Sequence, residues 1–111
     1  MKRYSLGKEE RVLKASDFKK VLQGGRKQCT EHFKVFVYHN HLERKRLGIT
    51  TSRKVGAAVK RNRIKRLLRE FFRLHKMCFP PSSDTVFIAQ PGADTLDYAR
   101  LREELKNILC V

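Results

Sequence analysis

Side chains that can bind phosphate are concentrated in one stretch of this sequence. Eight of the seventeen residues from 60 to 76 are Lys or Arg, and the only acidic residue among them is Glu70. At 100° per residue, four polar side chains share one side of a helix: Asn62, Arg66, Arg69 and Arg73. Like charges at this spacing repel by roughly 0.2–0.5 kcal/mol per pair, which is unusual for an ordinary solvated face. We therefore predict that a polyanion binds there.

The chemistry of these side chains suits nucleic acid. A planar guanidinium can donate two parallel hydrogen bonds to one phosphate, and an Asn amide can contact a sugar hydroxyl or a base edge. Over the whole chain, 26 Lys and Arg stand against 11 Asp and Glu, a formal charge of +15. Such an excess destabilises a compact protein unless a polyanion or salt screens it. The pattern alone does not distinguish DNA from RNA.

Composition and length exclude several other classes of protein. The 111 residues, 41% of them hydrophobic, predict one folded domain spanning residues 1–111. No apolar run approaches the roughly 20 residues needed to cross a bilayer, and the first residues lack the apolar region of a signal peptide. Three scattered cysteines favour free, buried thiols in a reducing compartment over a disulfide framework. We expect a cytoplasmic protein without membrane association.

Periodicity predicts the elements that carry the basic stretch. Ser16 or Asp17 is expected to cap a short helix that ends at Gly24 and Gly25. The long helix begins near Gly56 and ends before Pro80. Strands are predicted at residues 32–39, 47–52 and 85–90, with a weaker one at 26–29, and a last helix starts within residues 94–97. The predicted order is αβββαβα, an α/β (α+β) two-layer sandwich with a sheet of about four strands.

Two of these elements have distinct faces. In the long helix, five apolar side chains are expected to pack on the sheet: Ile64, Leu67, Leu68, Phe71 and Leu74. In the strand at 32–39, Phe33, Val35 and Val37 alternate with a second set: Lys34, Phe36 and Tyr38. Two aromatic rings beside a lysine are unusual for a plain solvent face. From the residues alone, Phe18 and Phe36 are better explained as core aromatics than as a binding surface.

The segment SRKVGAAVKRNRIKRLLREFF, residues 52–72, resembles the signature of the bacterial ribonuclease P protein subunit. That signature is an Arg-Asn-Arg triplet in a basic helix after a Ser-Lys/Arg-Lys-x-Gly turn. SDFKKVLQGG, FKVFVYHN and RLGITTS extend the resemblance over most of residues 13–89. It implies a small basic protein that assists a catalytic RNA in removing the 5′ leader of precursor tRNA. It also implies a left-handed βαβ crossover, the rare hand for this connection.

The resemblance further implies which residues bind which RNA. The surface for the catalytic RNA would comprise Arg53, Lys54, Arg61, Asn62, Arg63, Lys65, Arg66 and Arg69. The cleft for the leader would comprise Phe18, Leu22, Lys34 and Phe36. Magnesium ions would act in the RNA active site, so the chain would hold no cofactor and no catalytic residue. No obligate protein partner is implied.

This chain departs from the family pattern at two positions. Leu22 stands where an aromatic residue is frequent, so only apolar contact is expected there. Ala57 stands where a polar residue, often Asn, is common, so any hydrogen bond from that side chain is lost, although Ala favours the helix.

Three rival functions stay open at this point. An independent nuclease would need a metal or base site, for which His39, His41 and Glu43 are the nearest candidates. A ribosomal or general structured-RNA-binding protein would share the charge and differ in its partner. A helix-turn-helix DNA-binding protein is disfavoured because strands, rather than a second helix, flank the basic helix.

Overall fold

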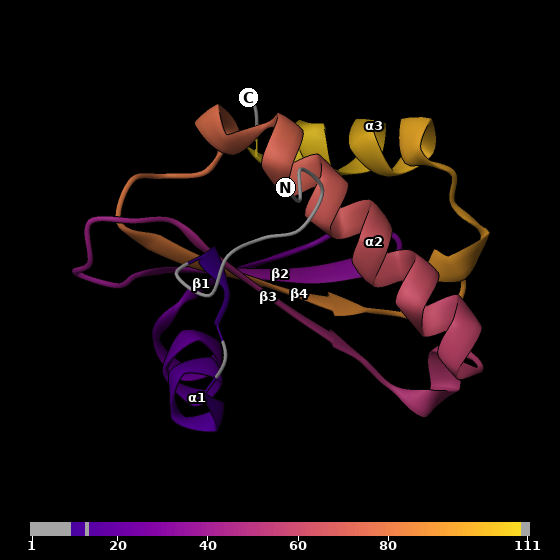
Figure 1. Ribbon diagram of the computed structural model, residues 1–111, viewed down its shortest axis with the longest axis horizontal. Coiled ribbons are helices and arrows are strands. Elements are labelled where there is room, and N and C mark those ends of the chain that lie inside the picture. The colour runs from indigo at the N-terminus through magenta and orange to yellow at the C-terminus, as the bar shows by residue number, and fades with distance from the viewer. Residues whose placement is uncertain (1–9, 13, 110–111) are drawn as a thin grey trace, which may run out of the picture.

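The computed structural model describes residues 10–12 and 14–109, which contain three helices and four strands (Figure 1). In chain order these are α1 (Ala15–Gly24), β1 (Arg26–Cys29), β2 (Phe33–His39), β3 (Arg46–Thr51), α2 (Ala58–Leu74), β4 (Ser83–Ala89) and α3 (Tyr98–Leu109). Three short 3₁₀ turns join them: η2 (Arg53–Val55), η3 (Lys76–Cys78) and η4 (Ala93–Thr95). The predicted order αβββαβα and the predicted sheet of about four strands are confirmed.

The four strands form one sheet in the order β1-β2-β4-β3. β2 pairs antiparallel with both β1 and β4, whereas β3 and β4 are parallel. Parallel neighbours need a crossover connection, and α2 supplies it. The basic helix α2 therefore connects two strands, β3 and β4, that are hydrogen-bonded to each other. The left-handed sense of this crossover stays an expectation from the resemblance.

Helices lie on both faces of the sheet. In Figure 1, α2 and α3 lie above the sheet and α1 lies below it. Side chains alternate along each strand, so Phe33 and Val35 of β2 and Phe87 of β4 point into the core beneath α2 and α3. Helical periodicity predicts one apolar stripe on α3, formed by Tyr98, Leu101, Leu105, Ile108 and Leu109. The structure confirms it, because Leu101 and Leu105 are fully buried in the same cluster and the other three pack against it.

The buried side of α2 differs from the prediction at one position. Ile64, Leu68 and Phe71 are fully buried as expected, but Leu74 is 51% exposed, and Phe72 is buried instead. The Phe72 ring packs 4.8 Å from the ring of Phe79, which lies beyond the helix end. Each fully buried side chain of this size contributes about 1.5–3 kcal/mol to stability. The core thus curls around the last turn of α2 toward the loop before β4.

The first helix ends at Gly24 as predicted, but its start differs in detail from expectation. α1 begins at Ala15 after Lys14, whose side chain makes no capping hydrogen bond, so neither Ser16 nor Asp17 is the cap. Asp17 lies in the first turn, where a carboxylate favours the positive end of the helix dipole. The last helix begins at Tyr98, just after the predicted start.

The prediction of free, buried cysteines was wrong for two of the three residues. Cys29 is a free thiol but is exposed on β1. Cys78 is half-buried in η3 and is disulfide-bonded. Cys110 lies outside the described residues.

Candidate nucleic-acid interface

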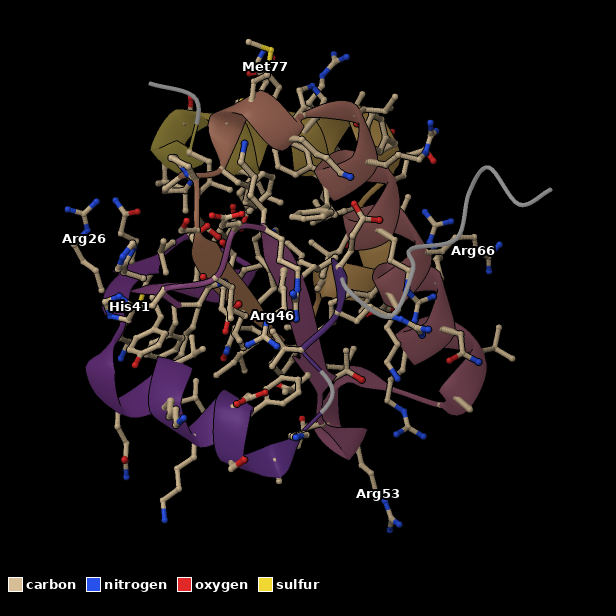
Figure 2. All side chains as sticks on the ribbon, turned by 60° about the vertical axis from the view of Figure 1, so that its left-hand side comes forward. Arg26, His41, Arg46, Arg53, Arg66 and Met77 are labelled. Atoms are coloured by element: carbon tan, nitrogen blue, oxygen red, sulfur yellow. The ribbon has the colours of Figure 1, made fainter. Side chains whose placement is uncertain are left out.

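The basic residues of α2 lie on the side of the helix that faces away from the core. Asn62 and Arg66 are exposed, and Arg61, Lys65 and Arg69 are half-buried along the flank nearer β3. Figure 2 shows Arg66 pointing outward from α2 and Arg53 pointing outward from the preceding turn. We call the following residues the basic face: Arg53, Lys54, Arg61, Asn62, Lys65, Arg66 and Arg69.

The carboxylates near α2 neutralise cations at its ends and leave the middle uncompensated. Lys60 lies 3.8 Å from Asp94 in the first turn, and Arg73 lies 3.1 Å from Glu70 near the last. Within residues 10–12 and 14–109, no ion pair involves Arg61, Lys65, Arg66 or Arg69. Four neighbouring cations without a carboxylate create a positive potential that attracts a polyanion.

Arg63 is placed differently from the other basic residues of this helix. Its Nη2 donates a hydrogen bond of 2.7 Å to the backbone carbonyl of Leu96, and its Nε lies 3.4 Å from the carbonyl of Asp94. These contacts tie α2 to η4 and occupy much of the guanidinium's donor fork. Arg63 is nevertheless exposed, so its role in RNA binding stays a prediction, and the basic face as defined above does not include it.

The turn before α2 fixes the positions of Arg53 and Lys54. Ser52 caps this turn, because its hydroxyl accepts a hydrogen bond of 3.2 Å from the backbone N–H of Lys54. Gly56 then adopts φ +144°, a backbone conformation that residues with a Cβ atom rarely adopt. The chain can thus pass from the end of β3 into α2 while both cations remain exposed.

A second surface lies on the sheet face that α1 partly covers. Register places Lys27, Phe36, Val86 and Gly48 side by side across the four strands. The ammonium of Lys27 lies 6.0 Å from the centre of the Phe36 ring, a cation–π distance. Lys34, two residues before Phe36 on the same face, is exposed.

Phe18 of α1 shares this sheet face. A Cβ atom at Gly48 would come within 2.9 Å of the Phe18 ring, so Gly48 is what lets α1 approach the sheet so closely. Phe18 and Phe36 are both half-buried and lie outside the main core cluster, and Leu22 is 39% exposed. We call the following residues the aromatic surface: Phe18, Leu22, Lys34 and Phe36.

A small cavity of about 160 Å³ lies between the basic face and the aromatic surface. Lys65 and Arg69 line it from α2, Phe18 from α1, and Arg11 from the segment before α1. Residues 47–49 of β3, an edge strand of the sheet, complete the lining. Sequence reasoning missed Arg11 and Gly48, although a glycine inside a predicted strand is a known signal of close approach.

The described residues offer no other recognisable chemical site. His39 and His41 have rings 4.3 Å apart, but among residues 10–12 and 14–109 no three His, Cys, Asp or Glu side chains are grouped to hold a metal ion. Within the same residues, no helix is long and apolar enough to cross a membrane.

Comparison with known proteins decides the family. The family model described as Ribonuclease P matches residues 6–110. The chain belongs to the ribonuclease P protein family. A ribonuclease P protein component from Syntrophus aciditrophicus is 45% identical over 98% of this chain and 92% of that protein. One from Desulfovibrio desulfuricans is also 45% identical, over 98% of this chain and 87% of its own length.

Solved ribonuclease P proteins share the fold. The protein from Staphylococcus aureus superposes with a TM-score of 0.82 at 32% identity, covering 91% of this chain and 93% of that one. The protein from Thermotoga maritima gives a TM-score of 0.81 at 35% identity, covering 90% and 94%. Membership of the ribonuclease P family makes this chain a protein subunit of a tRNA-processing endoribonuclease and disfavours the ribosomal alternative.

Proposed function

We propose that this subunit binds the catalytic RNA of ribonuclease P through its basic face and the 5′ leader of precursor tRNA through its aromatic surface. The observation that carries the proposal is the uncompensated middle of α2, where Arg61, Lys65, Arg66 and Arg69 have no ion pair among the described residues. A folded RNA would supply the missing negative charge.

The basic face suits the backbone of a structured RNA. Each phosphate that a Lys or Arg neutralises releases condensed counterions, and this release drives association without regard to sequence. Arg66 and Arg53 extend from two successive elements, so their contacts would span more than one phosphate (Figure 2). Asn62, exposed beside them, can bind a 2′-hydroxyl, which distinguishes RNA from DNA.

The aromatic surface suits an unpaired strand of variable sequence. Stacking of a base on an aromatic ring contributes roughly 1–3 kcal/mol and tolerates every base. Phe36 is half-buried with its ring beside a row of cations, Lys27 across the strand pair and Lys34 along the strand. A leader could stack on the ring while these ammonium groups contact its phosphates.

Phosphodiester hydrolysis itself is assigned to the RNA and its Mg²⁺ ions. In this arrangement the protein contributes binding: it holds the leader beside the catalytic RNA and screens the repulsion between two polyanions. We accordingly propose no catalytic residue and no protein-held metal. Assembly with a cellular RNA implies a cytoplasmic location.

Reconstitution tests the proposal. Added to a bacterial ribonuclease P RNA at low magnesium, the protein should restore removal of the 5′ leader from precursor tRNA. Protein alone should leave the precursor intact. Cleavage by protein alone, or no stimulation of the RNA, would reject the proposed role.

A substitution separates the two surfaces. Phe36→Ala should weaken binding of precursor tRNA by about tenfold, because one stacking contact is lost. Its effect on binding of leaderless tRNA, and on assembly with the catalytic RNA, should be below twofold. Equal losses for substrates with and without a leader would contradict the assignment of the aromatic surface.

A further inference from the structure

A row of three side chains on the sheet lies next to the aromatic surface and beneath α1. The strand register places Arg46 of β3, Asp84 of β4 and Tyr38 of β2 side by side. We call these three residues the Arg46 row. Tyr38 is two residues after Phe36 on β2, so the Arg46 row and the row that contains Phe36 are neighbours on the same side of the sheet.

Two contacts hold α1 above the Arg46 row. Near the start of the helix, Nη1 of Arg46 lies 3.5 Å from the carboxylate of Asp17. At the end of the helix, a Cβ atom at Gly24 would come within 3.1 Å of the Tyr38 ring, so the backbone of α1 lies directly on that ring. The helix therefore runs across the strands, from β3 at its start to β2 at its end.

The residue after Asp17 belongs to the aromatic surface. The Phe18 ring lies against Gly48, which is two residues after Arg46 on β3. Successive residues of a helix differ by 100° in direction, so Asp17 and Phe18 contact neighbouring rows of the sheet. Leu22 lies one turn after Phe18 on the same side of α1. The rotation of α1 about its own axis thus sets the direction of all three side chains together.

Apolar packing gives α1 little resistance to such a rotation. Within residues 15–24, Val21 is the one buried side chain. A cavity of about 160 Å³ borders the helix at Phe18, and another of about 320 Å³ borders it at Asp17 and Lys20. A closely packed interface resists rotation by itself, whereas a helix with cavities beside it needs directional contacts.

The sheet holds Arg46 rigidly enough to supply such a contact. Its Nε and Nη2 atoms both donate to Asp84, whose side chain is 2% exposed, and the Asn40 amide also donates to Asp84. The Nη1 atom is left to face α1. Asp17 is the only acidic residue between Ala15 and Gly24, so it is the one carboxylate of the helix that Arg46 can pair with.

We propose that Asp17 and Arg46 are positioning residues for binding of the 5′ leader. Their ion pair fixes the rotation of α1, and thereby the direction in which Phe18 and Leu22 point. The inference rests on the proposed binding of the leader by the aromatic surface. It gives a reason for a carboxylate in a helix that otherwise carries lysines, because an acidic group beside bound RNA repels it.

Asp17→Asn separates positioning from simple electrostatics. Removing a negative charge should by itself tighten RNA binding. The positioning role predicts the opposite: the reconstituted holoenzyme should bind precursor tRNA with a leader about two- to fivefold more weakly, the range for one partly exposed ion pair. Binding of leaderless tRNA and assembly with the catalytic RNA should not weaken. In turnover of the precursor, KM should rise while kcat stays unchanged.

A double-mutant cycle shows whether Asp17 acts through the aromatic surface. In a Phe18→Ala background, most of the leader-specific loss caused by Asp17→Asn should disappear, because the ring that the ion pair positions is absent. An equal loss in both backgrounds would overturn the positioning role. Asp17→Glu keeps a carboxylate within reach of Arg46 and should recover most of the affinity. If Asp17→Glu bound as weakly as Asp17→Asn, the ion pair would not be the cause.

Controls distinguish the possible failures. Glu43→Gln removes the same charge from an exposed position between β2 and β3 and should not weaken leader binding. Asp84 keeps its counter-ion in Asp17→Asn, so circular dichroism should show a folded variant. Unchanged or tighter binding of the precursor by Asp17→Asn would overturn the proposal. If Phe36→Ala still weakened binding of the leader alone in that assay, the proposed function would stand; if it did not, the aromatic surface itself would be rejected.

Discussion

The guanidinium of Arg46 donates two hydrogen bonds to the buried carboxylate of Asp84, from Nε to Oδ1 and from Nη2 to Oδ2, each at 2.7 Å. The Nη1 atom of Arg46 also lies 3.5 Å from the carboxylate of Asp17 in α1. The side-chain amide of Asn40 donates a hydrogen bond of 2.8 Å to Asp84 Oδ1. The hydrogen bond with Asp84 is the main cause that raises the pKa of Arg46, against the opposing effect of burial. One charged network thus joins β3, β4 and the helix that carries Phe18.

Removing Arg46 should destabilise the protein strongly. Arg46→Ala leaves the Asp84 carboxylate, whose side chain is 2% exposed, without its counter-ion, and we expect a loss of about 3–5 kcal/mol in the free energy of unfolding. Urea denaturation measures it. Arg44→Ala, an exposed neighbour in the preceding turn, is the control and should change stability by less than about 0.5 kcal/mol. A loss below 1 kcal/mol for Arg46→Ala would show that the pair is not structural.

Arg63 and Arg66 should separate stability from RNA binding. Arg63→Ala removes the donor to the Leu96 carbonyl and should cost about 1–2 kcal/mol of folding free energy, with little change in the salt dependence of RNA binding. Arg66→Ala should leave thermal unfolding nearly unchanged and weaken assembly with the catalytic RNA. Thermal melts and titrations of the two variants check this. Identical behaviour of the two would contradict the different placement of their side chains.

The start of α2 offers a stabilising substitution. Ala57 is the N-cap of the helix and provides no side-chain acceptor for its first N–H groups. Ala57→Asn should stabilise the protein by about 1 kcal/mol, which raises the melting temperature by about 4 °C. Differential scanning calorimetry measures the change. Ala58→Asn, one residue inside the helix, is the matched control and should not raise it, because an Asn there is past the capping position.

A carboxylate between α3 and the β1–β2 turn should make stability depend on pH. Glu104 accepts hydrogen bonds from the backbone N–H of His32 at 2.8 Å and from the Thr30 hydroxyl, and it lies 2.8 Å from His32 Nδ1. Burial opposes ionisation of Glu104, but these hydrogen bonds outweigh it and lower its pKa. A lowered pKa means that the contribution is fully present above the unfolded value of about 4.3 and is lost as pH falls through the folded value.

Denaturation at a series of pH values tests this contribution. Wild-type stability should decline as pH falls below about 4.3, and Glu104→Gln should be less stable at neutral pH with a smaller decline in acid. Glu103→Gln, the exposed neighbour on α3, should behave like wild type. If Glu104→Gln kept the full acid dependence, another carboxyl group would be responsible.

Local patterns predicted most of the fold because they agree with the tertiary contacts. The alternation in β2 and the apolar stripe of α3 each predict which side of the element is buried, and that side is buried in the structure. The prediction that Leu74 is buried was wrong, because helical periodicity does not include the contact with Phe79 beyond the helix end. That contact buries Phe72 instead. The predicted N-cap of α1 was also wrong. Ser16 and Asp17 are equally good caps in the sequence, but Asp17 contacts Arg46, which is remote in the chain.

The candidate site was predicted less completely than the fold. Periodicity places charges on a helix side, but it does not show which cations meet acceptors elsewhere, as Arg63 does at Leu96. Periodicity also does not predict that Arg11 and Lys65 line the same cavity. More than fifty residues separate them in the chain, and Arg11 reaches the cavity by pairing with Leu47 at the edge of the sheet. The family resemblance predicted the residues of the two surfaces, whereas the cavity between them is apparent only in the structure.

The dependence of holoenzyme assembly on salt tests the central claim most directly. If the basic face neutralises roughly five to eight phosphates, a plot of log affinity for the catalytic RNA against log salt should have a slope of about −4 to −7. A slope near zero would contradict an electrostatic interface on α2, whatever activity the protein supports.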